Sequence, residues 1–129
     1  MKMQPDRLEG VNVIARQEPG KIWVNHQAYT HSILVPHRGS VHAWSASSFE
    51  TLDSAAFAAI VALNPELVIL GTGSRLKFPA AALWRELMAR NIGFEAMDTA
   101  AASRTYNVLA SEGRVVLAAL LMENNGLAA

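Results

Sequence analysis

A glycine-rich turn after a short apolar run is the first place in this sequence where several groups could do chemistry together. The run Leu67–Leu70 is followed by Gly71-Thr72-Gly73-Ser74, and then by Arg75 and Lys77. Such a turn can present backbone N–H groups to an anion, and the two cations could add charge. The same glycines are also expected in a tight turn without a ligand. The turn is not a dinucleotide fingerprint, because Leu76 stands where the third glycine belongs, and no Gly-Lys-Ser/Thr phosphate loop follows.

A second polar group follows the next apolar segment, where Met97 is followed by Asp98 and Thr99. Asp98 could act as a general base or hold a ligand hydroxyl, and Arg104 could contact an anion. Both residues also have structural interpretations, because Asp98 or Thr99 can cap a helix and Arg104 can pair with Asp98. Asn107 lies about one turn beyond Arg104 on the same expected helix.

These two turns are expected to lie side by side, because each follows a strand of an expected parallel sheet. Open α/β sheets bind ligands at the carboxyl ends of their strands. The sequence therefore predicts a cleft that would suit a carboxylate or phosphate of modest size. Its candidate binding residues are Gly71, Thr72, Gly73, Ser74, Arg75, Asp98, Thr99, Arg104 and Asn107.

The other residues with reactive side chains do not form a recognisable metal or nucleophile set. The histidines His26, His31, His37 and His42 all fall in the first half and lack the helical spacing of zinc proteases. The serines near His42 do not form a Gly-x-Ser-x-Gly elbow. Cysteine is absent, which removes thiolate nucleophiles and cysteine metal sites. We therefore predict no bound metal, no cofactor and no catalytic residue.

Composition places the chain among globular proteins. It has 129 residues, of which 51% are apolar and 17% charged, and this excludes a disordered chain. Basic and acidic residues balance at 11 each, which argues against nucleic acid as a partner. No apolar stretch approaches the ~20 residues of a membrane span, and the polar N-terminus resembles no signal peptide. We expect a cytoplasmic protein with one domain over residues 1–129 and loosely ordered ends at 1–10 and 123–129; its oligomeric state stays open.

Helices and strands alternate in the second half. Asp53 can cap the first helix, and the unbroken apolar run Leu67–Leu70 is typical of a strand buried on both faces. Gly113 can end the last helix, and Val115–Leu121 is a strand or a helix, with the paired valines favouring a strand. The expected elements are a helix over 53–63, a strand over 67–70, a helix over 79–90, a strand over 94–97, a helix over 98–112 and a strand over 115–121.

The first half contains short β-branched or aromatic runs separated by Gly and Pro turns. These runs predict an antiparallel meander of strands at 11–15, 22–24, 32–35 and 41–44. Strands that alternate with helices, as in the second half, imply parallel crossovers. The predicted fold class is therefore α/β, with a mixed sheet, a central strand at 67–70 and helices packed on the sheet.

Three spaced motifs resemble one family. They are Gly71-Thr72-Gly73, the segment Ile92–Thr99 and the segment Arg104–Arg114. The family consists of small uncharacterised bacterial and archaeal domains, and it includes mitochondrial complex I assembly factor 3 and the adipogenesis-associated domain protein. The motifs cover residues 67–121 and agree in order. The resemblance implies an α/β domain with a mixed sheet and no established enzymatic activity.

The resemblance also implies a function. In the mitochondrial relative the role is in respiratory complex I assembly, together with a second assembly factor. This chain differs in two respects, because it begins without a mitochondrial presequence and carries Val115 where relatives often have a second basic residue. Two hypotheses follow: a non-enzymatic protein-interaction or assembly domain with a protein partner, or a protein that binds a small anion or metabolite at the cleft and that could be an enzyme.

Overall fold

A mixed five-stranded sheet forms the centre of the protein, for which a computed structural model describes residues 10–122. The strand order is β5-β4-β8-β6-β7; β6 runs parallel to β7 and β8, and β4 runs antiparallel to β8. The strands are β4 (Ile33–Pro36), β5 (His42–Ala43), β6 (Leu67–Gly71), β7 (Gly93–Met97) and β8 (Val116–Leu120). The α/β class and the mixed sheet predicted from the sequence are confirmed. The run Leu67–Leu70 lies in an interior strand, and β8 occupies the middle of the sheet.

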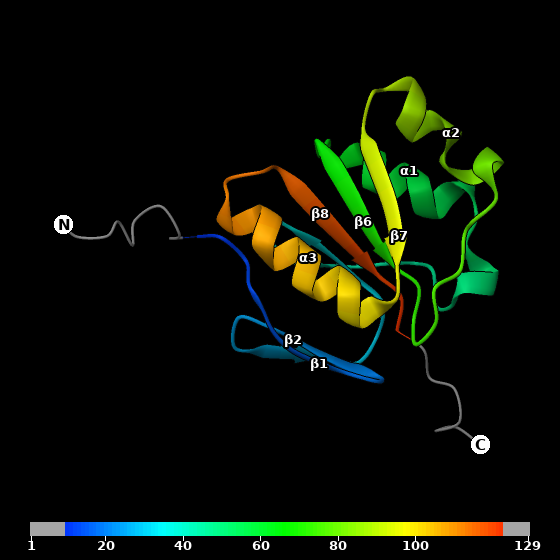
Figure 1. The fold of residues 1–129 in the computed structure, drawn as a ribbon. Helices are drawn as coiled ribbons and strands as arrows, with labels where there is room; N and C mark the ends of the chain where they lie inside the picture. The colour runs from blue at the N-terminus through cyan, green and yellow to red at the C-terminus, as the bar shows by residue number, and fades with distance from the viewer. Residues whose placement is uncertain (1–9, 123–129) are drawn as a thin grey trace, which may run out of the picture.

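Helices cover both faces of this sheet (Figure 1). They are α1 (Ser54–Ala62), α2 (Ala81–Ala89) and α3 (Thr99–Ser111), with a short 3-10 helix η2 (Phe49–Thr51) before α1. Val68 and Leu70 of β6 pack in the cluster that includes α1 and α2, whereas Ile69 packs in the cluster that includes α3. Successive residues of a strand point to opposite faces, so an unbroken apolar run is what a sheet covered on both sides requires.

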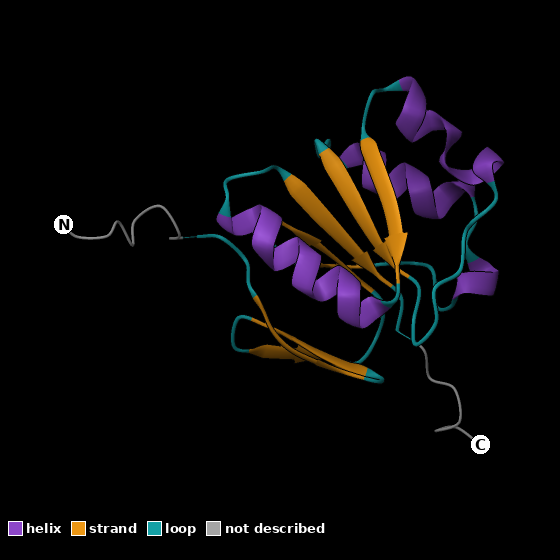
Figure 2. Cartoon of the chain, in the orientation of Figure 1, coloured by secondary structure: helices purple, strands orange, loops and turns teal. Residues whose placement is uncertain are grey.

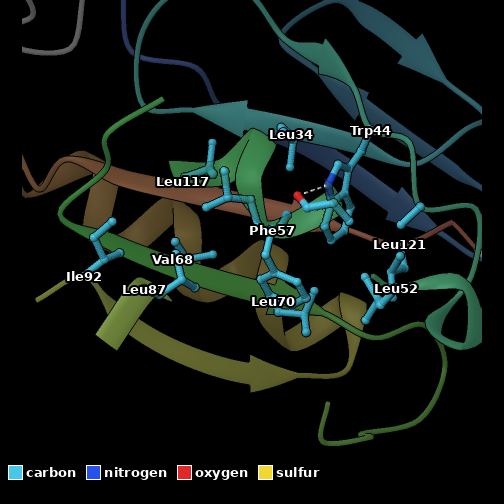
Figure 3. Packing of buried hydrophobic residues seen from close by; sticks show 14 residues of the cluster. Leu34, Trp44, Leu52, Phe57, Val68, Leu70, Leu87, Ile92, Leu117 and Leu121 are labelled. Carbon is cyan, nitrogen blue, oxygen red and sulfur yellow. Dashed lines mark hydrogen bonds between the residues drawn. The ribbon is translucent and has the colours of Figure 1, made fainter. Parts of the chain in front are cut away.

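The cluster beneath α1 and α2 includes Trp44, which lies at one side of it (Figure 3). The indole Nε1–H donates to the carbonyl oxygen of Ala56 in α1 at 3.0 Å, which satisfies the one polar atom of a nearly buried side chain. Phe57 and Leu70 pack in the same cluster. These residues form a buried hydrophobic core on this side of the sheet.

A separate three-stranded sheet packs on the outer side of α3 (Figure 2). It is the antiparallel meander β1 (Ile14–Glu18), β2 (Lys21–Val24) and β3 (Gln27–Tyr29). Ile22 and Val24 from this sheet share a buried cluster with Tyr106 of α3. Helix α3 therefore lies between the two sheets.

The four-stranded meander expected for the first half is wrong in one respect. The strands near 14, 22 and 28 do form a meander, but β4 and β5 belong to the five-stranded sheet, where β4 pairs with β8. Ile33, Leu34 and Val35 are all buried. An exposed hairpin would leave one face of such a run in water, whereas an interior strand buries both faces. The expected strand at 115–121 is confirmed as β8.

The sequence also predicted loosely ordered ends and no membrane-spanning segment. The expected loose ends fall on residues that, apart from Gly10, lie outside the described part of the chain. Within residues 10–122, none of the helices has the length and apolar character needed to cross a bilayer.

Candidate functional site

The two polar turns identified in the sequence lie against each other at the carboxyl edge of β6 and β7. The Thr72 N–H donates to the Met97 carbonyl oxygen at 2.8 Å. Gly73 and Thr99 bond twice, because the Gly73 N–H donates to Thr99 Oγ1 and the Thr99 N–H donates to the Gly73 carbonyl oxygen, both at 2.8 Å. These bonds close the crevice between the loops that lead to α2 and α3.

Two glycines make this close approach possible. Gly73 has a φ of +99°, a conformation that other residues rarely adopt. A Cβ on Gly71 would lie 2.9 Å from Leu120 Cδ2 and 3.1 Å from the Thr99 backbone Cα. The glycine pattern is therefore explained by the local packing of the two loops.

The side chain of Thr72 fixes the path of the loop that follows β6. It is fully buried, and its Oγ1 lies 2.6 Å from the Arg75 carbonyl oxygen and 3.1 Å from the Met97 carbonyl oxygen. The same oxygen accepts the Lys77 N–H at 3.1 Å. The backbone N–H groups of Thr72, Gly73 and Lys77 thus already donate hydrogen bonds within the protein. An anion bound near this turn would therefore rely on other donors.

Asp98 and Thr99 begin helix α3. The Asp98 carboxylate accepts the Ala101 N–H at 2.8 Å, which makes Asp98 the N-cap; such a cap stabilises a helix by about 1 kcal/mol. Asp98 and Thr99 also line a pocket of about 430 Å³ together with Gly73, Ser74 and the turn between β1 and β2. The structure therefore brings together the Gly73–Ser74 and Asp98–Thr99 parts of the predicted cleft.

Arg104 and Asn107 lie elsewhere, on the side of α3 that faces β1. They line a different, smaller pocket of about 240 Å³, together with Ile14 and its neighbours. The Asn107 amide pairs with the backbone of Ile14 in both directions: its Oδ1 accepts the Ile14 N–H and its Nδ2 donates to the Ile14 carbonyl oxygen, each at 2.9 Å. The Asn107 side chain therefore bonds to the backbone of β1 as a neighbouring strand would.

We expect Asn107→Ala to destabilise the protein, because it removes both hydrogen bonds to Ile14. Each bond contributes about 0.5–1.5 kcal/mol, so the expected loss in the free energy of unfolding is about 1–3 kcal/mol, measured by urea denaturation. Arg104→Ala on the same helix is the matched control, because Arg104 is exposed, and it should change this free energy by less than about 0.5 kcal/mol. Equal effects of the two substitutions would show that Asn107 does not anchor β1.

Ser74 and Arg75 border a larger pocket that the sequence did not reveal. It measures about 840 Å³ and is also lined by His31, Trp44 and Lys77, among others. These residues come from segments far apart in the chain, so no local spacing could have signalled their convergence. Of its lining residues, the sequence singled out only Ser74, Arg75 and Lys77, which lie at the glycine-rich turn.

An ion pair ties one wall of this larger pocket to the other. Lys77 Nζ lies 3.3 Å from Glu50 Oε2 and 5.4 Å from the centre of the Phe49 ring. The pKa of the Glu50 carboxyl is lowered, first by a hydrogen bond from its own backbone N–H and then by Lys77. Glu50 is therefore ionised at neutral pH and pairs with Lys77.

The chain is thus a small α/β protein in which a mixed five-stranded sheet and a separate three-stranded meander pack on opposite sides of helix α3. The chain belongs to the family described as "Protein of unknown function (DUF498/DUF598)", which it matches over residues 14–121. This confirms the family resemblance seen in the sequence.

Relatives in this family include proteins with an assigned name. The chain is 35% identical over 95 residues to human NADH dehydrogenase (ubiquinone) 1 alpha subcomplex assembly factor 3, a match that covers 72% of this chain and 50% of that protein. It is 40% identical over 87 residues to an uncharacterized protein of Rhodobacter capsulatus, covering 66% of this chain and 70% of that protein. The chain spans about half the length of the assembly factors it matches.

A solved structure with the same architecture comes from Bordetella parapertussis. Its crystal structure superimposes with a TM-score of 0.83 at 35% sequence identity, covering 88% of this chain and 98% of that one. The arrangement of the two sheets around α3 is therefore shared with an experimentally determined relative.

Proposed function

We propose that this chain is a non-enzymatic protein-interaction domain that takes part in the assembly of a protein complex. The names of the mammalian relatives support the proposal, since they describe an assembly factor for NADH dehydrogenase. The polar residues of the predicted cleft also support it. Asp98 caps a helix, Thr72 and Thr99 hold two loops together, and Asn107 anchors a strand. These structural contacts account for their residue types without an active site.

The observation that carries the proposal is the apolar surface of the loop between β6 and α2. Phe78 is 74% exposed and Leu76 is 50% exposed, and both lie on this loop. Aromatic side chains are enriched in the buried cores of protein interfaces. A large aromatic residue held in water on a monomer surface is therefore a natural anchor for a partner.

The loop that carries these side chains is held in place. Thr72 fixes its beginning through three contacts, and Lys77 pairs with Glu50 between the two apolar residues. An interaction surface that is already ordered loses less conformational entropy when a partner binds. The loop therefore presents Leu76 and Phe78 as a prepared contact, which we call the Phe78 loop (residues 74–80).

The proposal predicts that partner capture depends on the Phe78 loop. A tagged protein carrying Leu76→Ser and Phe78→Ser should lose the proteins that the wild type retains, by at least about tenfold in quantitative mass spectrometry, because removing an anchor typically costs 2 kcal/mol or more. Met88→Ser is the matched control, because Met88 is 57% exposed on α2, outside the loop, and it should retain the same partners.

The identity of the captured proteins completes this test. We expect subunits of an NADH dehydrogenase, the enzyme in the relatives' names, or a second assembly protein among those lost with the loop variant. Partner sets that do not differ between the loop variant and Met88→Ser would show that the Phe78 loop is not the interaction surface.

A second candidate function is the binding of a small anion or metabolite at the carboxyl edge. The specific observation in its favour is that the Arg75 side chain borders the larger pocket beside Ser74. The Gly73–Ser74 and Asp98–Thr99 residues border the neighbouring pocket of about 430 Å³. In this second proposal, the predicted residues at this edge of the sheet bind the anion.

A further inference from the structure

The larger pocket at the carboxyl edge is assembled from four separate parts of the chain. It lies between the segment before β4, the segment from Trp44 to η2, the loop after β6 and the residue Met122 after β8. Ligand pockets in proteins typically measure about 300–1,000 Å³, and the volume here is about 840 Å³. In open α/β sheets this edge is where ligands bind. Size and position therefore fit a small organic molecule.

The floor of this pocket is apolar and rigid. Trp44 is 5% exposed and Met122 is 6% exposed, and Ser32 lies between them. The Ser32 carbonyl oxygen accepts the Trp44 N–H, and Ser32 Oγ accepts the Met122 N–H, each at 2.9 Å. With the indole also bonded to Ala56, the floor is fixed before any ligand arrives.

The walls of the pocket carry positive charge. Arg75 and Lys77 line the pocket together with one acidic residue, Glu50, and Lys77 is already paired with it. Among the described residues, the Arg75 guanidinium makes no ion pair or side-chain hydrogen bond. A guanidinium matches the two oxygens of a carboxylate or phosphate, so Arg75 is the group available to an anion.

His31 adds a second polar contact at the rim. Its Nδ1 lies 3.1 Å from the Ser32 carbonyl oxygen, a distance at which a proton on Nδ1 is donated to that oxygen. The ring packs edge-on against Tyr29, with 5.9 Å between ring centres. Its Nε2 makes no hydrogen bond to any described residue, so this atom is the one left for a ligand.

We propose that this pocket binds a small organic anion, with a phosphate or carboxylate group at Arg75 and an apolar body against Trp44 and Met122. The inference rests on the second candidate function above and deepens it, because it assigns a ligand class to the larger pocket, to which the Phe78 loop contributes Ser74, Arg75 and Lys77. Lys77 adds positive charge beside the anion, and the His31 Nε2 contacts a polar group of the ligand at the rim.

Titration with phenyl phosphate, followed through the amide and indole N–H signals in NMR, tests the proposal on the full chain. Phenyl phosphate should shift the Trp44 indole and the Ser74–Lys77 amides in a saturable way. Arg75→Ala should weaken binding at least about tenfold, the equivalent of about 1.4 kcal/mol. Arg104→Ala removes the same charge from the exposed surface of α3, outside this pocket, and should leave the affinity within about twofold.

Several outcomes would overturn the proposal. Phenyl phosphate that produces no saturable shift, or equal weakening by Arg75→Ala and Arg104→Ala, would show that no specific anion site exists. Inorganic phosphate that binds as tightly as phenyl phosphate would refute the apolar half of the site. The two functions are distinguished by Leu76→Ser with Phe78→Ser, which removes the two exposed apolar side chains, leaves Arg75 in place and should retain phenyl phosphate.

Discussion

Leu70→Asp is expected to leave little folded protein. Leu70 is fully buried in the interior strand β6 and packs in the cluster beneath α1 and α2. A lone carboxylate there must be desolvated or take up a proton, and we expect a loss of more than about 4 kcal/mol. A protein of this size has about 5–15 kcal/mol of stability in total, so most of it is lost. The measurement is the free energy of unfolding in urea, or the melting temperature.

The control for Leu70→Asp makes the same chemical change at a solvent-exposed position. Leu76→Asp introduces the same carboxylate at a side chain that is 50% exposed, and it should change the unfolding free energy by less than about 0.5 kcal/mol. A Leu70→Asp protein that melts within a couple of degrees of wild type would contradict the interior position of β6.

Tyr106→Ala is expected to cost about 3–5 kcal/mol, because it empties the space between α3 and the meander. Tyr106 is fully buried, and its hydroxyl donates to the Asn12 carbonyl oxygen at 2.8 Å, with the Pro36 carbonyl oxygen at 3.2 Å. Tyr106→Phe keeps the ring and removes only the hydroxyl, so it should cost about 1–3 kcal/mol in the same urea experiment. Equal losses of unfolding free energy for the two variants would show that the Tyr106 ring does not fill the space between α3 and the meander.

The phenol of Tyr106 also predicts a loss of stability in alkali. Burial raises its pKa above the usual 10.0, so the folded state holds the proton when an unfolded tyrosine has released it. The stabilisation is complete below pH 10 and is lost as the pH rises above about 10. Tyr106→Phe should lack this part of the alkaline decline; an unchanged pH profile would contradict the assignment.

The sequence predicts those parts of the fold whose signals are local. Asp53 caps α1, as predicted, and Asp98 caps α3, where the sequence offered Asp98 or Thr99. The unbroken run Leu67–Leu70 correctly predicted a strand with neighbours on both sides. Caps and apolar runs act over a few residues, so they can be recognised without knowing the rest of the structure.

The errors concern contacts between distant segments. The run Ile33–Val35 carries the same signal of burial on both faces as β6, yet its partner β8 lies far along the chain, and the nearby turns favoured a hairpin interpretation. Asn107 shows the same problem, because its amide pairs with Ile14, and no spacing in the sequence connects the two.

The candidate site was predicted in part for the same reason. Because both turns follow parallel strands, the sequence predicted that Gly71–Ser74 and Asp98–Thr99 lie together. The hydrogen bonds between Gly73 and Thr99 show that the two turns are in contact. The larger pocket depends on His31, Trp44 and Met122, which converge only in the folded protein. Only Ser74, Arg75 and Lys77, the part of this pocket close to the glycine turn, could be identified in advance.

Photo-crosslinking in cells tests the central claim, that the Phe78 loop binds a protein partner, most directly. A benzophenone amino acid replaces Phe78 in one protein and Met88 in another, both of which are well-exposed positions. We predict a discrete crosslinked protein from position 78 that position 88 does not give. Capture of the same proteins by both positions, or none by position 78 while the protein is folded, would contradict the account.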